Sequence, residues 1–132
     1  MQNQRPKQGE TYWCDPDPNL LDQVGSEQKG DRIWLIVSYH QRGKCVVALP
    51  LSRHFEKSES GIPWLIKVTA ENITMVDGNP AINRIALTDQ IRCLDKERLR
   101  KQAGYITPRA VIAVLDGLDR LLGRRFPLPN SN

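Results

Sequence analysis

Short runs of apolar residues, separated by polar segments rich in glycine and proline, recur along most of the chain. Runs of about four to eight β-branched and aromatic residues between such turn signals are typical of β-strands. The pattern predicts strands at residues 10–14, 32–39, 45–49, 63–68 and 84–94. Within 32–39 the apolar run from Ile33 to Val37 is nearly continuous, which indicates that both faces of this strand are covered.

Proline and glycine set the predicted boundaries of these strands. Asp15-Pro16-Asp17-Pro18 ends the first strand and Pro50 ends the third, because proline lacks the N–H that a strand ladder needs. Residues 15–31 show no periodicity, and connections of this length are usually functional or disordered. Residues 70–83 are predicted to be mostly loop with a possible helical turn, and Asp95 is predicted to cap a short helix that runs through Lys101.

A helix is predicted after Thr107-Pro108, with threonine as the N-cap and proline at the first helical position. Gly123 ends it. Apolar residues recur at helical spacing along it, at Val111, Val114, Leu115, Leu118, Leu121 and Leu122. A stripe of this kind packs on a sheet or on a partner. The chain therefore predicts a small, mostly antiparallel β-barrel with a closing helix, as one domain over residues 9–123, with a disordered lead (1–8) and a flexible tail (124–132).

Composition narrows the class of protein only modestly. The 132 residues carry a formal charge of +4, which suits a polyanion such as RNA. The odd number of cysteines (Cys14, Cys45 and Cys93) and their place in strand-like segments predict buried free thiols in a reducing cytosol rather than a zinc site. The polar N-terminus has no apolar signal segment, and no apolar run is long enough to span a bilayer. We therefore expect a cytoplasmic protein with no membrane partner.

Residues that could take part in binding or catalysis lie at the ends of two predicted strands. Arg32 lies where a glycine-punctuated polar loop meets the strand at 32–39, a position from which its guanidinium is expected to meet an anion such as phosphate. Ser52, Arg53 and His54 follow the strand at 45–49. The pKa of histidine suits a general base, and His54 is the better candidate because His40 lies in a surface turn.

The order of these pieces resembles the MazF/PemK family of toxin endoribonucleases over residues 7–123. The matching stretches are Gly9-Glu10-x-Tyr12-Trp13, Asp15-x-Asp17-Pro18, Gly25-Ser26-Glu27-Gln28-x-Gly30-x-Arg32, Pro50-Leu51-Ser52 and Asp89-Gln90-Ile91-Arg92-x-Leu94-Asp95-Lys96-x-Arg98-Leu99. The resemblance implies an SH3-like barrel of the CcdB/PemK type and a homodimer. It also implies metal-independent cleavage of single-stranded RNA without a cofactor, and neutralisation by a cognate antitoxin.

The same resemblance implies roles for individual residues. Arg32 matches the catalytic arginine, which stabilises the phosphorane, and Ser52 matches the Thr/Ser position that contacts the scissile phosphate. Glu27 would orient Arg32, and Asp89 matches an acidic position proposed as the base in some relatives. The residues expected to bind RNA are Gln28, Lys29, Arg53, His54 and Gln90. The chain departs from the family at Ile33, where proline is usual, and at Ser52, where threonine is frequent.

Several interpretations stay open at this stage. Glu27 also fits a solvent-exposed glutamate, and Asp89 fits a buried carboxylate bonded to backbone equally well. Trp34 and Trp64 suit packing better than base stacking, because they lie in strands. Two other functions compete with RNA cleavage: a non-catalytic barrel that binds a protein, as CcdB poisons gyrase, and a degenerate relative that binds RNA or antitoxin without cutting.

Overall fold

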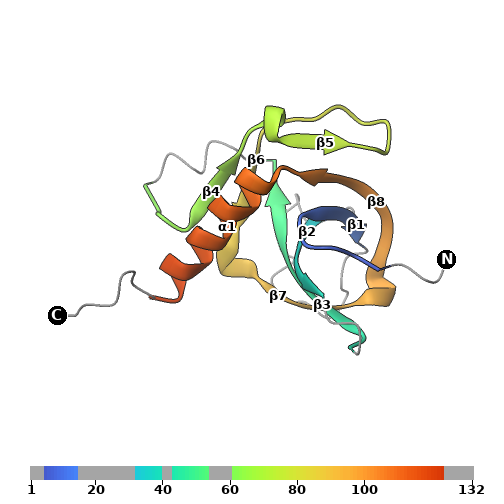
Figure 1. Cartoon of the computed structure of the whole chain (residues 1–132), viewed down its shortest axis with the longest axis horizontal. Coiled ribbons are helices and arrows are strands. Elements are labelled where there is room, and N and C mark those ends of the chain that lie inside the picture. The colour runs from blue at the N-terminus through green and yellow to red at the C-terminus, as the bar shows by residue number, and fades with distance from the viewer. Residues whose placement is uncertain (1–4, 15–31, 40–42, 54–60, 124–132) are drawn as a thin grey trace.

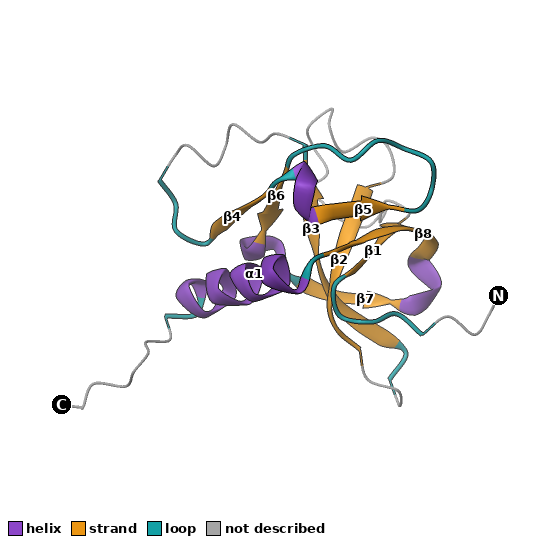
Figure 2. Cartoon of the chain, turned by 45° about the horizontal axis from the view of Figure 1, so that its top comes forward, coloured by secondary structure: helices purple, strands orange, loops and turns teal. Residues whose placement is uncertain are grey.

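The computed structural model describes residues 5–14, 32–39, 43–53 and 61–123. Within these ranges eight strands form one curved sheet, and an α-helix follows the last strand (Figures 1 and 2). The strands are β1 (Glu10–Cys14), β2 (Arg32–Tyr39), β3 (Cys45–Ser52), β4 (Leu65–Val68), β5 (Ile73–Met75), β6 (Arg84–Leu87), β7 (Arg92–Asp95) and β8 (Leu99–Ile106), and the helix is α1 (Pro108–Leu121). Mostly antiparallel β-structure with a C-terminal helix was predicted, and this fold class is confirmed.

The strand order is β4-β6-β3-β2-β1-β8-β5, with β7 paired to β3 beside this path. All of the recorded pairs are antiparallel. Register shifts interrupt the β1–β8 pair on both sides of Tyr12 and the β2–β3 pair between Ile36 and Ser38. Such irregularities bend the strands and increase their twist, so the sheet curls around its own interior (Figure 1).

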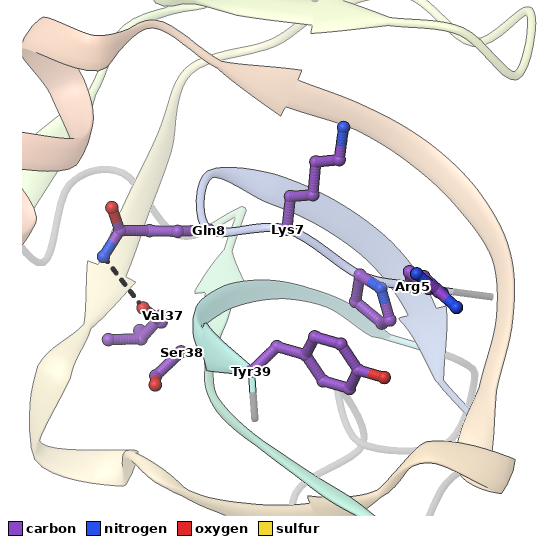
Figure 3. Close-up of a pocket in the computed structure, with 7 residues that line it drawn as sticks. Arg5, Lys7, Gln8, Val37, Ser38 and Tyr39 are labelled. Atoms are coloured by element: carbon purple, nitrogen blue, oxygen red, sulfur yellow. Dashed lines mark hydrogen bonds between the residues drawn. The ribbon is translucent and has the colours of Figure 1, made fainter. Parts of the chain in front are cut away.

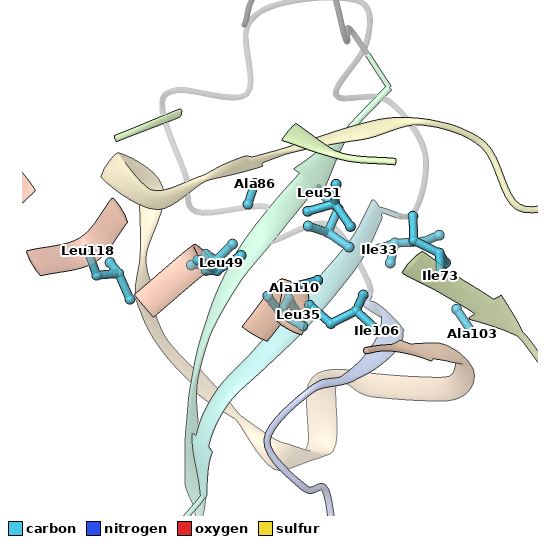
Figure 4. Close-up of a cluster of buried hydrophobic side chains, with 12 residues drawn as sticks. Ile33, Leu35, Leu49, Leu51, Ile73, Ala86, Ala103, Ile106, Ala110 and Leu118 are labelled. Atoms are coloured by element: carbon cyan, nitrogen blue, oxygen red, sulfur yellow. The ribbon is translucent and has the colours of Figure 1, made fainter. Parts of the chain in front are cut away.

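Alternate side chains of β2 and β3 supply two separate buried clusters. Ile33 and Leu35 of β2 lie in the larger cluster, which also takes Val114 and Leu118 from α1 (Figure 4). Trp34 and Ile36 lie in the smaller cluster, on the opposite face of the same strand. Both faces of β2 are therefore covered, as its continuous apolar run predicted.

The helix begins as predicted. The Thr107 side chain accepts a hydrogen bond from the Ala110 amide at 3.2 Å, and Pro108 occupies the first turn. The stripe ends earlier than predicted, because Leu122 is the C-cap and is 75% exposed. Gly117 brings the helix close to β4, since a Cβ at this position would lie 2.6 Å from Cγ1 of Ile66.

The predicted bounds of the strands at 45–49 and 84–94 are wrong. The segment 84–94 is not one strand: β6 ends at Leu87, the 3-10 helix η4 (Thr88–Gln90) turns the chain, and β7 follows. The Thr88 hydroxyl donates to the carbonyl of Trp64, which holds this turn in place. Pro50 does not end β3, because it lies between the part of β3 that pairs with β7 and the part that pairs with β6. A missing N–H is tolerated where a strand changes partner.

The C-terminal half also holds strands that the pattern did not predict. Asp95 caps the 3-10 helix η5 (Lys96–Arg98) by accepting from the Glu97 amide at 2.9 Å. The helix does not reach Lys101, however, because β8 begins at Leu99. The segment 70–83 contains the 3-10 helix η3 (Ala70–Asn72), as the expected helical turn, and then the short strand β5.

The cysteine prediction is only partly right. Cys14 is buried, but Cys45 and Cys93 are exposed, and none of the three forms a disulfide. Cys45 and Cys93 lie on the outer face of the β3–β7 pair, whereas the adjacent residues Val46 and Leu94 point inward and fill the smaller cluster.

Across the described ranges, no helix combines the length and the apolar character needed to cross a membrane.

Candidate active site

Arg32 is the first residue of β2 and pairs with Cys14 of β1. Its guanidinium carbon lies 6.0 Å from the ring centroid of Trp34, two residues further along the same face of the strand. Trp34 is buried in the smaller cluster, so its role in packing is confirmed. A cation held over an indole face is attracted by the ring electrons, which restrains the half-buried Arg32 side chain at the strand end.

Ser52 is the last residue of β3 and is 7% exposed. The β2–β3 register pairs Leu35 with Leu49 and Trp34 with Pro50. Continued by two residues, this register brings Arg32 and Ser52 to the same end of the strand pair and to the same face of the sheet. The register thus brings a guanidinium and a hydroxyl to one strand end, and both are groups that can donate hydrogen bonds to phosphate oxygens.

The other predicted site residues occupy different places. Arg53 follows Ser52 directly and is exposed. Asp89 and Gln90 are exposed on η4, so the alternative of a buried structural Asp89 is wrong. Because β6 runs antiparallel to β3 and Ile85 pairs with Ser52, the chain moves away from Ser52 on the order of 10 Å before it reaches Asp89. Four further candidates lie outside the described residues: Glu27, Gln28, Lys29 and His54.

A charged cluster that the sequence did not predict lies beside the end of β3. Arg84, the first residue of β6, is 8% exposed and donates from Nη1 to the Leu51 carbonyl at 3.3 Å. Asp77 accepts a hydrogen bond from Trp13 Nε1 at 2.7 Å, and Asn79 donates to the same carboxylate. No local signal identifies these contacts, because they join residues that are 33 and 64 positions apart.

The pKa of Asp77 is perturbed in two directions. Burial raises it, but the hydrogen bonds from Trp13 and Asn79 outweigh burial and hold the pKa below its ordinary value. A carboxylate whose pKa is lower in the folded state stabilises that state above the unfolded pKa of about 3.9. This contribution is lost as the pH falls through the folded pKa.

We expect Asp77→Asn to weaken the pH dependence of stability in acid. Thermal unfolding measured from about pH 6 to about pH 2 should show a shallower fall in Tm for this variant than for the wild-type protein. Asp116→Asn, which removes an exposed carboxylate of α1, is the matched control. An acid profile of Asp77→Asn with the wild-type slope would contradict the role of the Trp13 and Asn79 hydrogen bonds.

A pocket of about 550 Å³ lies at the far end of β2 (Figure 3). Its lining includes Arg5, Lys7 and Tyr39 but neither Arg32 nor Ser52. Beside it, the Lys96 ammonium donates to the Tyr39 hydroxyl at 3.2 Å and lies 5.1 Å from the centroid of its ring. Since Arg32 begins β2 and Tyr39 ends it, this basic pocket is separate from the Arg32–Ser52 site.

Among the residues that the structure describes, no three His, Cys, Asp or Glu side chains are grouped so as to hold a metal ion.

Residues 7–122 match the family model of the PemK-like, MazF-like toxins of type II toxin-antitoxin systems. The chain belongs to this family. The match spans the strand ends that carry Arg32 and Ser52, so the resemblance read from the motifs is confirmed.

Solved structures share the MazF-like fold over nearly their whole length. MazF (Form-I) from Deinococcus radiodurans is 24% identical, with 92% of this chain and 99% of that chain covered and a TM-score of 0.64. An endoribonuclease from Mycobacterial species is 24% identical, with 94% and 97% covered and a TM-score of 0.64. A Mycobacterial endoribonuclease in complex with its cognate antitoxin is 23% identical, with 92% and 97% covered and a TM-score of 0.59. No curated protein sequence matches the chain.

Proposed function

We propose that this MazF-like toxin is an endoribonuclease that cleaves single-stranded RNA at short sequences without a metal ion. The observation that carries the proposal is the placement of Arg32 and Ser52 at one end of the β2–β3 pair, on one face of the sheet. Two of the solved structures with this fold are named endoribonucleases, which supports the same activity.

The proposed reaction is a transesterification within the RNA. The ribose 2′-oxygen loses its proton and attacks the adjacent phosphorus, the bond from phosphorus to the 5′-oxygen breaks, and that oxygen takes up a proton. The products are a 2′,3′-cyclic phosphate and a 5′-hydroxyl. Arg32 stabilises the extra negative charge of the phosphorane with its forked N–H donors. Ser52 donates a hydrogen bond to the scissile phosphate and attacks nothing, because the nucleophile belongs to the substrate.

The remaining candidate residues take supporting roles in this proposal. Glu27 orients Arg32, and Gln28, Lys29 and His54 bind RNA. Asp89 and Gln90 are exposed on η4, several residues along the sheet from Ser52. That separation favours a role for Asp89 in contacting flanking nucleotides over its role as the base at the scissile ribose. Neutralisation by a cognate antitoxin and assembly as a homodimer complete the proposal, and a solved relative in complex with its antitoxin supports the first of these.

The test of the function is RNA cleavage in the presence of EDTA. We expect the purified protein to cut single-stranded RNA under these conditions, and a 2′-deoxy substitution at the cleaved position to abolish the cut. Replacement of Ser52 by alanine should lower the single-turnover rate about 10²-fold, the usual scale for the loss of one donor to a developing oxyanion. Ser52→Thr, which keeps the hydroxyl, is the matched control and should retain most of the activity.

Each outcome of this test has a clear meaning. RNA that stays intact at high protein concentration refutes the nuclease, and binding without cutting then favours a degenerate relative. Cleavage that requires a divalent ion refutes the metal-independent mechanism. Equal rates for Ser52→Ala and the wild-type protein refute only the role assigned to Ser52, and the nuclease activity is unaffected by that result.

A further inference from the structure

Arg84 is a buried charge that the proposed reaction does not use. It begins β6, is 8% exposed, and donates from Nη1 to the carbonyl of Leu51, the residue before Ser52. Burial of a guanidinium is costly unless its N–H groups find acceptors. Within the described part of the chain the recorded acceptor is the Leu51 carbonyl, so other N–H groups of Arg84 remain available to an anion.

The register of β3 and β6 brings a second arginine to the same place. Leu51 pairs with Ala86, and Ser52 pairs with Ile85. Arg53 follows Ser52 at the end of β3 and Arg84 precedes Ile85 in β6, so the two arginines meet at this end of the strand pair, and the charge of Arg53 acts on Arg84. Like charges directly opposite each other across two strands are destabilising, so this pair favours the binding of a negative ligand.

The nearby carboxylate does not balance this pair. Asp77 is already occupied by hydrogen bonds from Trp13 Nε1 at 2.7 Å and from the amide and side chain of Asn79. The pKa of Arg84 is lowered by burial first and by the positive charge of Arg53 second, against a smaller opposing effect of Asp77. An excess of positive charge therefore remains between the two guanidiniums.

We propose that Arg53 and Arg84 form a second phosphate-binding site, which holds a phosphate of the RNA backbone next to the scissile one. Guanidinium groups bind phosphate through paired N–H donors, which fixes both distance and orientation. Arg84 alternates with Ile85, the partner of Ser52, and so shares the face of Ala86 and Leu51, while Arg53 follows Ser52 beyond the end of β3; both arginines are thus set apart from the Arg32–Ser52 pair. They therefore contact a different phosphate from the one that is cleaved. The site rests on the proposed function, since it serves the same RNA strand.

The experiment measures RNA binding apart from RNA cleavage. The probe is a single-stranded RNA with a 2′-deoxy substitution at the cleaved position, and its Kd is measured from about 50 to about 200 mM salt. Arg84→Met and Arg53→Met should each weaken binding about tenfold at the lower salt. Loss of one phosphate contact should also reduce the slope of log K against log salt by about 0.7, the value for single strands. Arg120→Met, which removes an exposed arginine at the end of α1, should match the wild-type protein.

The salt slope separates phosphate binding from a purely structural role of Arg84. If Arg84 only braces the end of β3, Arg84→Met lowers stability but keeps the wild-type slope, and the site is refuted. Arg53 is exposed, so Arg53→Met gives the same test on a variant whose core is intact. If the wild-type protein binds and cuts RNA, but both variants keep its slope of log K against log salt, the second phosphate site is refuted and the proposed function is not. A wild-type protein that does not bind RNA refutes the proposed function together with the site.

Discussion

Replacement of Arg32 by alanine is expected to lower RNA cleavage by about 10² to 10³-fold, the largest effect on activity of any single change proposed. The guanidinium begins β2 beside Trp34 and stands at the strand end that carries Ser52. In the proposed reaction it supplies permanent positive charge where the phosphorane gains negative charge, so its removal should raise the barrier more than it weakens binding of the uncleaved RNA. Single-turnover rates and the Kd for 2′-deoxy-substituted RNA, measured on one preparation, separate the two effects.

Arg32→Lys is the informative companion to this variant. Lysine keeps the charge but loses the planar fork, so we expect an intermediate rate. Arg120→Ala removes an exposed arginine of α1 and should cut RNA at the wild-type rate. Arg32 is half-buried against Trp34, so a matched Tm for Arg32→Ala and the wild-type protein must accompany the rates. Equal cleavage by Arg32→Ala and the wild-type protein would remove Arg32 from the mechanism.

The parts of the fold that the sequence predicts correctly are those that local chemistry determines. β1 and β2 have the predicted bounds, because aromatic and β-branched runs end at strong turn signals. The start of α1 is also correct, since Thr107 and Pro108 are favourable at their positions in almost any context. In each case the residues that form the element also specify its ends.

The errors occur where a distant segment determines the structure. β8 carries charged residues and glycine instead of an apolar run, and it is a strand because β1 and β5 pair with its two edges. Pro50 stays within β3 because β3 changes its partner from β7 to β6 around that residue. Both effects depend on pairings between segments far apart in the chain, which local propensity does not report.

The same distinction applies to the candidate site. Arg32 and Ser52 were identified by their positions at strand ends and by the family motifs, and the register then brought them together. Arg84 gave no such signal, since one charged residue at the start of a strand is ordinarily solvent-exposed. Its contact with Leu51 exists only after β3 and β6 have paired. The proposed catalytic pair can thus be predicted from the sequence, whereas the buried Arg84 beside it becomes visible only once β3 and β6 have paired.

The largest expected effect on stability comes from Gly104→Ala in β8. Gly104 pairs with Met75 of β5, and a Cβ at this position would lie 1.9 Å from the Thr74 carbonyl oxygen and 2.9 Å from the Met75 Cα. These are backbone atoms, so no side-chain rotation relieves the overlap, and β5 must move away from β8. We expect the free energy of unfolding to fall by about 3 kcal/mol or more, at the upper end of the cost of overpacking. Urea unfolding with an unchanged m-value measures it.

Two other glycines serve as comparisons, because replacement by alanine should cost less stability at each of them than at Gly104. At Gly117 a Cβ would lie 2.6 Å from the Ile66 side chain, which can partly rotate away, so Gly117→Ala should cost less. At Gly78 the added Cβ meets no atom within 4 Å beyond its own residue and the two adjacent residues, and only the positive φ of 92° opposes alanine. That strain costs about 1 kcal/mol. If Gly104→Ala proves as stable as Gly78→Ala, the backbone of β5 does not lie as near to Gly104 as described. The tight pairing of β5 with β8 at this edge of the sheet would then be wrong.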